Sequence, residues 1–227
     1  MTTRFPGGIT TVTKSSPLGM FGLPDPTEWH VFFDDFDTYT AAQWTVTETG
    51  DGTQALTDID GGALLITTAA LDNDAVFMQK VGESFLLATG KKSFFKARFK
   101  VAKSTQSDFQ IGLIVTDTTP LDATDGIYFQ KDDGDQNLDI ICRKNATTGS
   151  TTAVAGTVAD NTFLTVAWYY DGAGNLSYFV DDVKKGTLDA SSSYLPDTEL
   201  TVSFGFVNGE AGATTLTLDY VFAAKQR

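Results

Sequence analysis

The sequence has almost none of the residues from which most metal and redox sites are built. Its 227 residues include one cysteine, Cys142, and one histidine, His30. A single cysteine excludes an intrachain disulfide and a cysteine-rich zinc site. A single histidine excludes most metal sites that use several imidazole ligands. We therefore expect the fold to be held by hydrophobic packing rather than by cross-links.

Basic residues are also scarce. Lysine and arginine total 16 against 29 aspartates and glutamates, so the formal net charge is −13. Proteins that bind DNA or RNA carry a basic patch, and anionic lipid surfaces attract basic segments. The charge balance therefore argues against both a nucleic acid and a membrane as partners.

Long apolar runs are missing. No stretch approaches the roughly 18 apolar residues of a membrane-spanning helix. The first 25 residues also lack the apolar core of a secretory signal. We therefore expect a protein that is synthesised in a cytosol.

Helix signals are few, whereas strand signals recur along the chain. Only five of the 29 acids are glutamate, and aspartate is typical of turns rather than helices. More than a dozen strands require two packed sheets, so we expect an all-β sandwich. The expected strands are 29–36, 43–49, 63–68, 75–80, 93–101, 109–116, 127–131, 138–144, 162–170, 176–181, 183–188, 200–207 and 214–224.

Alternation within these strands predicts the core, because successive side chains of a strand point to opposite faces. The pattern assigns Trp168 to one face and Tyr169 to the other. A glycine-containing loop at 171–175 predicts a hairpin, and 200–207 and 214–224 are expected to pair across 208–212. The expected inward residues are Leu164, Val166, Trp168, Tyr170, Leu176, Tyr178, Val180, Phe204, Phe206, Leu216, Leu218 and Tyr220.

Residues 1–28 differ in composition from the rest of the chain. They hold four of the six prolines and carry no net charge. Proline and glycine disfavour a regular helix or a central strand there. The segment nevertheless contains spaced apolar residues: Phe5, Ile9, Val12, Leu18, Met20, Phe21 and Leu23. We therefore expect an extended N-terminal arm at 1–28 that contacts a partner through these side chains, and a β-sandwich at 29–227.

The body of the chain resembles a known sandwich family. The resemblance rests on Phe33-Asp-Asp-Phe36, the strand 94–101, the hairpin 165–182 and the closing segment 216–221. These residues are similar to those of concanavalin A-like, laminin-G-like domains. The resemblance covers roughly residues 29–225 and implies a two-sheet antiparallel jelly roll.

The N-terminal residues resemble a narrower group. Met1–Ile9, Gly22–Pro26 and Phe33–Asp37 are similar to segments of virion structural proteins of tailed bacteriophages, commonly head decoration (cement) proteins. The resemblance implies a non-enzymatic homo-oligomer, by analogy a trimer, whose arm binds the major capsid protein. It also implies a place on the capsid surface of the virion after synthesis in the host cytoplasm.

Two alternatives come from other functional classes. A carbohydrate-binding module would use exposed aromatic side chains and Asp/Asn loops on the same sandwich, and such a module could be displayed on a virion. The candidates for stacking on a sugar are Trp29, Trp44, Trp168, Tyr169 and Tyr170.

A glycosidase is the third alternative, because retaining glucanases of this fold carry a Glu-x-Asp-x-Glu strand that places two carboxylates close together. The residues two positions after the five glutamates are His30, Gly50, Phe85, Thr201 and Gly212, and none is aspartate. The motif is therefore absent. A pair of aspartates could still replace it.

The remaining candidates each have a structural alternative. Asp132, Asp133 and Asp135, with Asn137, could bind calcium through oxygen ligands or could form a solvated hairpin tip. His30 lies near Asp34 and Asp35 in sequence, but no local serine signature supports a catalytic triad. Cys142 sits in an apolar strand, where a small packed side chain is the simpler interpretation.

Overall fold

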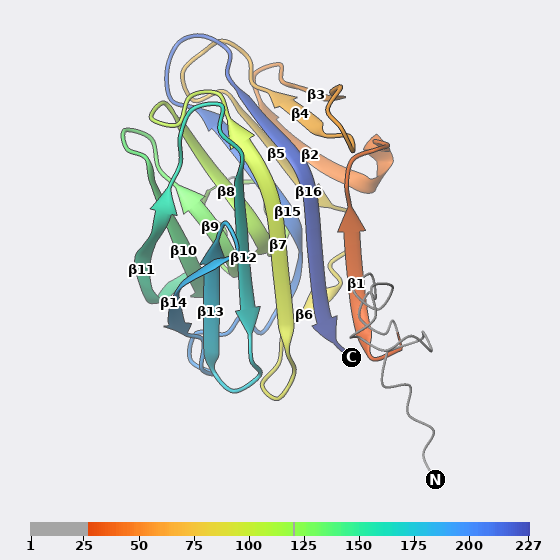
Figure 1. Ribbon diagram of the computed structural model, residues 1–227, viewed down its shortest axis with the longest axis vertical. Helices are drawn as coiled ribbons and strands as arrows, with labels where there is room; N and C mark the ends of the chain where they lie inside the picture. Colours follow the sequence, from red (N-terminus) through yellow and green to blue (C-terminus); the bar gives the residue numbers. More distant parts are fainter. Residues whose placement is uncertain (1–26, 120) are drawn as a thin grey trace.

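The computed structural model describes residues 27–119 and 121–227, which fold into two antiparallel sheets packed face to face (Figure 1). The expected two-sheet jelly roll is confirmed. Within the described ranges the single helical element is the short 3-10 turn η2 (Ala41–Gln43). None of the helices in this part of the chain is long and apolar enough to cross a membrane. The arm residues lie outside the described residues: Phe5, Ile9, Val12, Leu18, Met20, Phe21 and Leu23.

The first sheet has the strand order β14-β13-β12-β7-β16-β4-β3, and β1 pairs with the second half of β16. Its strands are β1 (Trp29–Asp34), β3 (Thr53–Leu56), β4 (Leu64–Thr67), β7 (Ser93–Val101), β12 (Leu164–Tyr170), β13 (Asn175–Val180), β14 (Val183–Asp189) and β16 (Thr215–Gln226). Strands β1 and β4 occupy successive parts of the same edge of β16.

The second sheet has the order β11-β10-β9-β8-β15-β5-β2, with β6 paired to the start of β15. Its strands are β2 (Trp44–Thr49), β5 (Ala75–Lys80), β6 (Phe85–Leu86), β8 (Ser107–Ile114), β9 (Gly126–Lys131), β10 (Asn137–Lys144), β11 (Thr147–Thr157) and β15 (Glu199–Asn208). Strands β8 and β15 lie in its centre, so both of their faces are buried.

All thirteen expected strands are present, within a few residues of their expected ends. The predicted hairpin at 171–175 is confirmed, and Asp171 closes it by accepting hydrogen bonds from the backbone N–H groups of Ala173 and Asn175. Three strands were not predicted, namely β3, β6 and β11. Strand β11 is rich in threonine, glycine and alanine, so it lacks the apolar alternation that marks a strand.

The expected pairing of 200–207 with 214–224 is wrong. Strand β15 pairs with β5, β6 and β8 in the second sheet, whereas β16 pairs with β1, β4 and β7 in the first. The loop between them crosses from one sheet to the other. Each strand has one apolar face. These two faces are turned toward each other across the core between the sheets, and the strands themselves are not neighbours in one sheet.

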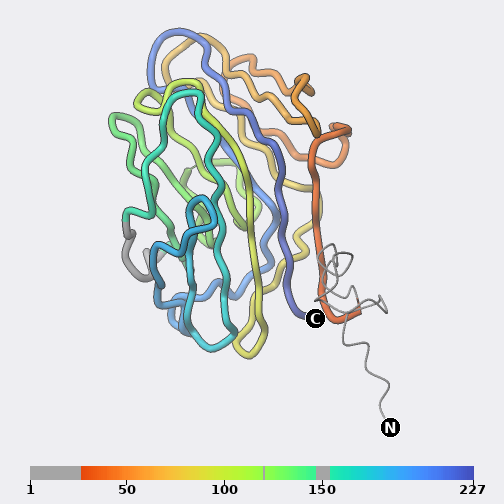
Figure 2. Tube along the Cα trace, in the orientation of Figure 1, coloured from red at the N-terminus to blue at the C-terminus, as the bar shows by residue number. Residues whose placement is uncertain are grey.

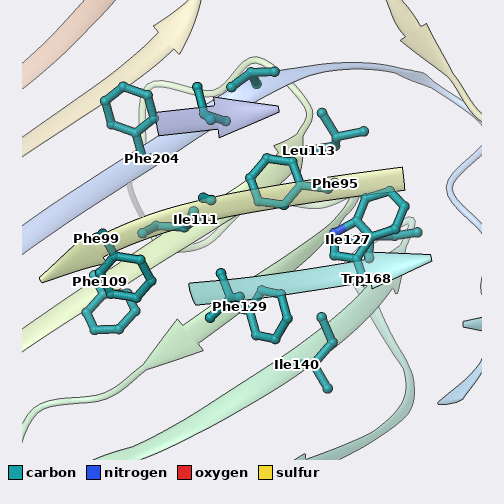
Figure 3. Packing of buried hydrophobic residues seen from close by; sticks show 14 of the residues in the cluster. Phe95, Phe99, Phe109, Ile111, Leu113, Ile127, Phe129, Ile140, Trp168 and Phe204 are labelled. Carbon is teal, nitrogen blue, oxygen red and sulfur yellow. The ribbon is translucent and has the colours of Figure 1, made fainter. Parts of the chain in front are cut away.

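The core fills the space between the sheets and is rich in phenylalanine (Figure 3). Phe204 of β15 contacts the ring of Trp44 at a centroid distance of 4.9 Å and that of Phe36 at 6.2 Å. Trp168 of β12 stacks on Phe95 of β7 at 6.1 Å. All five rings are buried. The predicted split between Trp168 and its neighbour Tyr169 is confirmed, because Tyr169 is partly exposed on the outer face.

One predicted core residue points outward. Tyr220 is partly exposed, although Leu216 and Leu218 on the same strand are fully buried as expected. A register shift between Leu218 and Tyr220 marks a β-bulge at Asp219. An extra residue in a strand reverses the facing of every residue after it, so Val221 and Ala223 take the inward positions.

The described chain begins and ends at the same edge. Trp29 of β1 pairs with Gln226 of β16, and the backbone N–H of Arg227 donates to the carbonyl of Glu28 at 2.9 Å. The trace in Figure 2 shows β1 beside the C-terminus. The described chain therefore starts next to β1, at the edge of the first sheet.

Candidate functional site

The outer face of the second sheet carries polar side chains in register across its central strands. The residues of one row are Thr45, Gln79, Ser203, Gly112, Tyr128 and Ile141. The residues of the next row are Thr47, Phe77, Gly205, Gln110, Gln130 and Asp139. The opposite face of these strands is almost wholly apolar and forms the core. The polar side chains on the outer face therefore have no part in core packing.

The chain segment between β8 and β9 lies over the first of these rows. The side-chain amide of Gln79 donates to the carbonyl of Val115 at 3.0 Å, and its oxygen accepts the backbone N–H of Asp117 at 2.9 Å. Ala123 of the same segment packs on Tyr128 in a small apolar cluster. The segment between β8 and β9 therefore covers this row.

In the second row the ring of Phe77 packs directly against Gly205. A Cβ atom at Gly205 would fall 1.8 Å from the nearest ring carbon of Phe77. Phe77 is 1% exposed, so its ring is covered as well as supported. This half of the row is therefore apolar and covered, and the polar half lies beside it.

The polar half of this row is a chain of hydrogen bonds. Gln110 donates through Nε2 to Oε1 of Gln130 at 3.0 Å, and Gln130 donates through Nε2 to Oδ1 of Asp132 at 2.6 Å. Asp139 pairs directly with Gln130 on the neighbouring strand. We call Gln110, Gln130, Asp132 and Asp139 the amide–carboxylate row. Because Gln110 is fully buried, it fixes the orientation of the partly exposed amide of Gln130.

The surroundings of the row are acidic. Burial raises the pKa of Asp139, and the neighbouring charges of Asp132 and Asp135 raise it further. Burial also raises the pKa of Asp108 on β8, although that carboxylate accepts the backbone N–H of Asp133. Oε1 of Gln110 has no hydrogen-bond partner within the described part of the chain. The acceptors that the row exposes are those of Gln130, Asp132 and Asp139, which suit a ligand that donates hydrogen bonds.

The five glutamates lie outside the row. Glu48 accepts from Gln54, Glu83 accepts the backbone N–H of Thr116, and Glu210 pairs with Lys103. Glu28 precedes β1, and Glu199 is the first residue of β15. A close pair of glutamates is therefore not formed at the row.

The predicted calcium ligands do not converge. Asp132 is held by Gln130, and both carboxylate oxygens of Asp135 accept hydrogen bonds from Asn137. In residues 27–119 and 121–227, no group of three or more histidine, cysteine, aspartate or glutamate side chains could hold a metal ion. Asp132, Asp133 and Asp135 instead belong to a hydrogen-bonded hairpin tip between β9 and β10.

His30 and Cys142 have structural surroundings. Nε2 of His30 lies 3.0 Å from Oγ of Ser84, and its ring packs on Phe85. Burial and the charges of two neighbouring cations lower the pKa of His30. Asp34 lies four residues along an extended strand and accepts the N–H of Phe36, so a triad is not assembled. Cys142 is buried, and burial raises the pKa of its thiol to about 12, as a packed side chain requires.

The aromatic residues considered for sugar stacking do not gather at the row. Trp44, Trp168 and Tyr170 are buried in the core. Trp29 and Tyr169 are partly exposed, but both face outward from the first sheet. A ligand at the amide–carboxylate row would therefore be held mainly by hydrogen bonds.

Of the row, the sequence singled out Asp132 alone, as a calcium candidate, whereas Gln110, Gln130 and Asp139 were not identified. Gln110 is the one polar side chain inside the dense apolar run Phe109–Ile114, and a polar residue in a buried strand usually has a specific hydrogen-bonding role. That signal could have singled it out. Its connection to Gln130 depends on strand register, which the sequence pattern does not fix.

No protein-family description matches the sequence, and no curated protein matches it. Solved structures share its fold. A protein of unknown function from Shewanella oneidensis superposes with a TM-score of 0.63 at 12% identity, covering 96% of this chain and 97% of its own. A family 16 endo-glucanase from Bacteroides ovatus gives 0.63 at 16%, covering 84% and 98%. The carbohydrate recognition domain of Emp47p gives 0.60 at 12%, covering 88% and 97%. The chain thus has the concanavalin A-like jelly-roll fold of glucanases and lectin domains.

Proposed function

We propose that the chain is a non-enzymatic carbohydrate-binding domain and that the amide–carboxylate row contacts the glycan. Solved structures with this fold include a carbohydrate recognition domain and glucan-acting enzymes. Hydroxyl groups of sugars donate hydrogen bonds, and the row presents carboxylate and amide oxygens to accept them. The observation that carries the proposal is the oriented chain from Gln110 through Gln130 to Asp132.

The row is held in place before any ligand arrives. Gln110 is buried and its amide fixes that of Gln130, so little side-chain freedom remains to be lost on binding. Gln130 and Asp139 are directly paired and partly exposed, which places an amide and a carboxylate side by side. Such an arrangement supports recognition of two neighbouring donors on one ligand.

The same geometry supports binding without hydrolysis. Retaining glycosidases use two carboxyl groups about 5–5.5 Å apart on either side of the scissile bond. No glutamate belongs to the row, and of its two carboxylates, Asp132 and Asp139, the first is held by Gln130. We therefore assign no general acid or nucleophile to the row.

Replacing Gln130 by methionine or Asp139 by alanine should weaken glycan binding roughly tenfold or more, because each change removes a hydrogen bond to a polar ligand. Binding would be measured on a glycan array and then by calorimetry with the best ligand. The matched controls are Gln54→Met on the other sheet and Asp72→Ala in an exposed loop, which should bind as the wild type does. Release of reducing sugar from the bound glycan, lost in Asp139→Ala, would instead show an enzyme.

A second candidate function comes from the N-terminal sequence. We propose that the sandwich is carried on the capsid surface of a tailed-bacteriophage virion and is attached through residues 1–28 to the major capsid protein. The support is the resemblance of this segment to decoration proteins, together with its neutral, apolar character beside an acidic body. The two functions are compatible, since a virion can display a glycan-binding domain.

Deleting residues 1–25 should abolish binding to capsids and leave the sandwich folded, because the core is made by residues that follow the deletion. Co-sedimentation with undecorated capsids measures the first effect, and circular dichroism measures the second. Full decoration of capsids by the truncated protein would show that the arm is not the anchor.

A further inference from the structure

The outer face of the first sheet is aromatic, which is unusual for a surface that the described chain does not cover. Side chains of five adjacent strands meet there, namely β1, β16, β7, β12 and β13. We call this surface the aromatic face, and its aromatic residues are Phe33, Phe94, Tyr169, Phe179, Tyr220 and Phe222. It is the side of the sandwich turned toward the viewer in Figure 1.

The rings form a contiguous surface. Phe33 pairs with Phe222 across β1 and β16 at a centroid distance of 6.4 Å, and Phe94 of β7 lies 5.6 Å from Phe222. Tyr169 pairs with Phe94 on the next strand. Phe33 is 52% exposed, and the other rings are partly exposed. Outward faces of antiparallel sheets are normally polar, so a contiguous apolar area indicates a binding surface.

The charge of this face differs from that of the whole protein. Lys96, Arg98 and Lys100 occupy alternate outward positions of β7. Lys96 pairs with Asp182 at 2.6 Å, Arg98 pairs with Asp219, and Lys100 lies over the ring of Phe163. The face therefore has both signs of charge and a small positive excess, on a chain whose net charge is −13.

The geometry favours a protein surface over a sugar as the occupant. The ring pairs Phe33–Phe222 and Phe94–Phe222 are tilted by 56° and 58°, so they do not form a flat platform for pyranose rings. The arm of this chain, neutral over residues 1–28, is the competing occupant, and the labelling test below distinguishes it from a second copy. A second copy presents both signs of charge and the same apolar area.

The size of the face also fits a copy of itself. Strands β1, β16, β7, β12 and β13 have 6, 12, 9, 7 and 6 residues. At about 3.3 Å per residue and about 4.8 Å between strands, their outer face covers roughly 600 Å², comparable with the roughly 800 Å² that each partner buries in a standard interface. Two acidic molecules repel each other least where their acidic density is lowest. We propose that two copies of the chain associate through the aromatic face in an isologous contact. The contact is independent of the glycan row, which lies on the other sheet.

The first test labels a cysteine placed on the face. Ser177 is partly exposed beside Tyr169, and Cys142 is buried, so Ser177→Cys in the full chain introduces one accessible thiol. We expect its reaction with a bulky maleimide to slow as protein concentration rises. Ser193→Cys, exposed in a loop, is the control and should react equally fast throughout. Rapid labelling at all concentrations would show an uncovered face, and slow labelling at all concentrations would show cover by the chain's own arm; either overturns the proposal.

The second test measures the dissociation constant by sedimentation. Phe33→Thr combined with Phe222→Thr should raise it roughly tenfold or more, because hydrophobic anchors dominate interfaces. Threonine keeps strand propensity, and circular dichroism and the melting temperature report on folding. Leu71→Thr, which replaces a 71% exposed residue off the face, should leave the constant unchanged. A monomer at all concentrations, or equal constants for the well-folded double variant and the control, would contradict the proposed interface.

Discussion

Replacing Phe204 by alanine is expected to lower the free energy of unfolding by about 3–5 kcal/mol, the cost typical of removing a buried aromatic ring. Phe204 is fully buried on the central strand β15, and its ring contacts Trp44 and Phe36. These neighbours come from β2 and from the loop after β1, so the ring joins parts of the chain that are distant in sequence. The cavity would lie where backbone on both sides is fixed by strand pairing, which limits its collapse.

Urea unfolding monitored by far-ultraviolet circular dichroism measures this loss. Leu71→Ala is the control, because Leu71 is 71% exposed and its replacement should change stability by less than about 0.5 kcal/mol. A loss below about 1 kcal/mol for Phe204→Ala would show that the core around this ring is not packed as described.

Replacing Gly205 by alanine is the second change with a large expected effect. The added methyl group would fall 1.8 Å from Cδ2 and 2.3 Å from Cε2 of Phe77, so the ring must move. Because Phe77 is buried beneath neighbouring side chains, we expect a loss of about 1–3 kcal/mol from overpacking. The displaced ring would also disturb Gln110, which follows Gly205 in the same register row.

Gly156→Ala is a matched control, since its new methyl group would meet Val180 at 3.4 Å, an ordinary contact distance. A double-mutant cycle assigns the effect to the ring. Gly205→Ala combined with Phe77→Ala should cost less than the sum of the single changes, because the clash is absent once the ring is removed. Additive losses would show that the glycine serves another purpose.

Much of the fold could be predicted from the sequence because alternation of apolar residues reports directly on strands with one buried face. Strands such as β7, with Phe95, Ala97 and Phe99 inward, carry that pattern clearly. Two features of the fold could not be predicted from this alternation. The bulge at Asp219 reversed the facing of Tyr220, and the separation of β15 from β16 depends on which sheet each strand joins. Both are decided by tertiary packing rather than by local pattern.

The candidate site was less predictable than the fold. Absence of the glutamate motif and the packed role of Cys142 followed from residue types alone. The amide–carboxylate row needs the register that places Gln110 opposite Gln130 and Gln130 opposite Asp139. Aromatic residues were the candidates for the alternative of a sugar site, and the partly exposed ones, Trp29 and Tyr169, lie on the first sheet. Residue type alone did not show on which outer face each side chain lies, because that depends on the strand order.

The proposed assignment of the glycan to the second sheet can be tested directly by nuclear magnetic resonance. The best ligand from the glycan array would be titrated into protein labelled with ¹⁵N, and the side-chain amide signals of Gln130 and Gln110 would be followed. We expect these signals and the backbone amide of Asp139 to shift in a saturable way, while Ser177 on the first sheet stays unchanged. Saturable shifts confined to the first sheet, with the amides of Gln110 and Gln130 unmoved, would contradict a glycan site at the amide–carboxylate row.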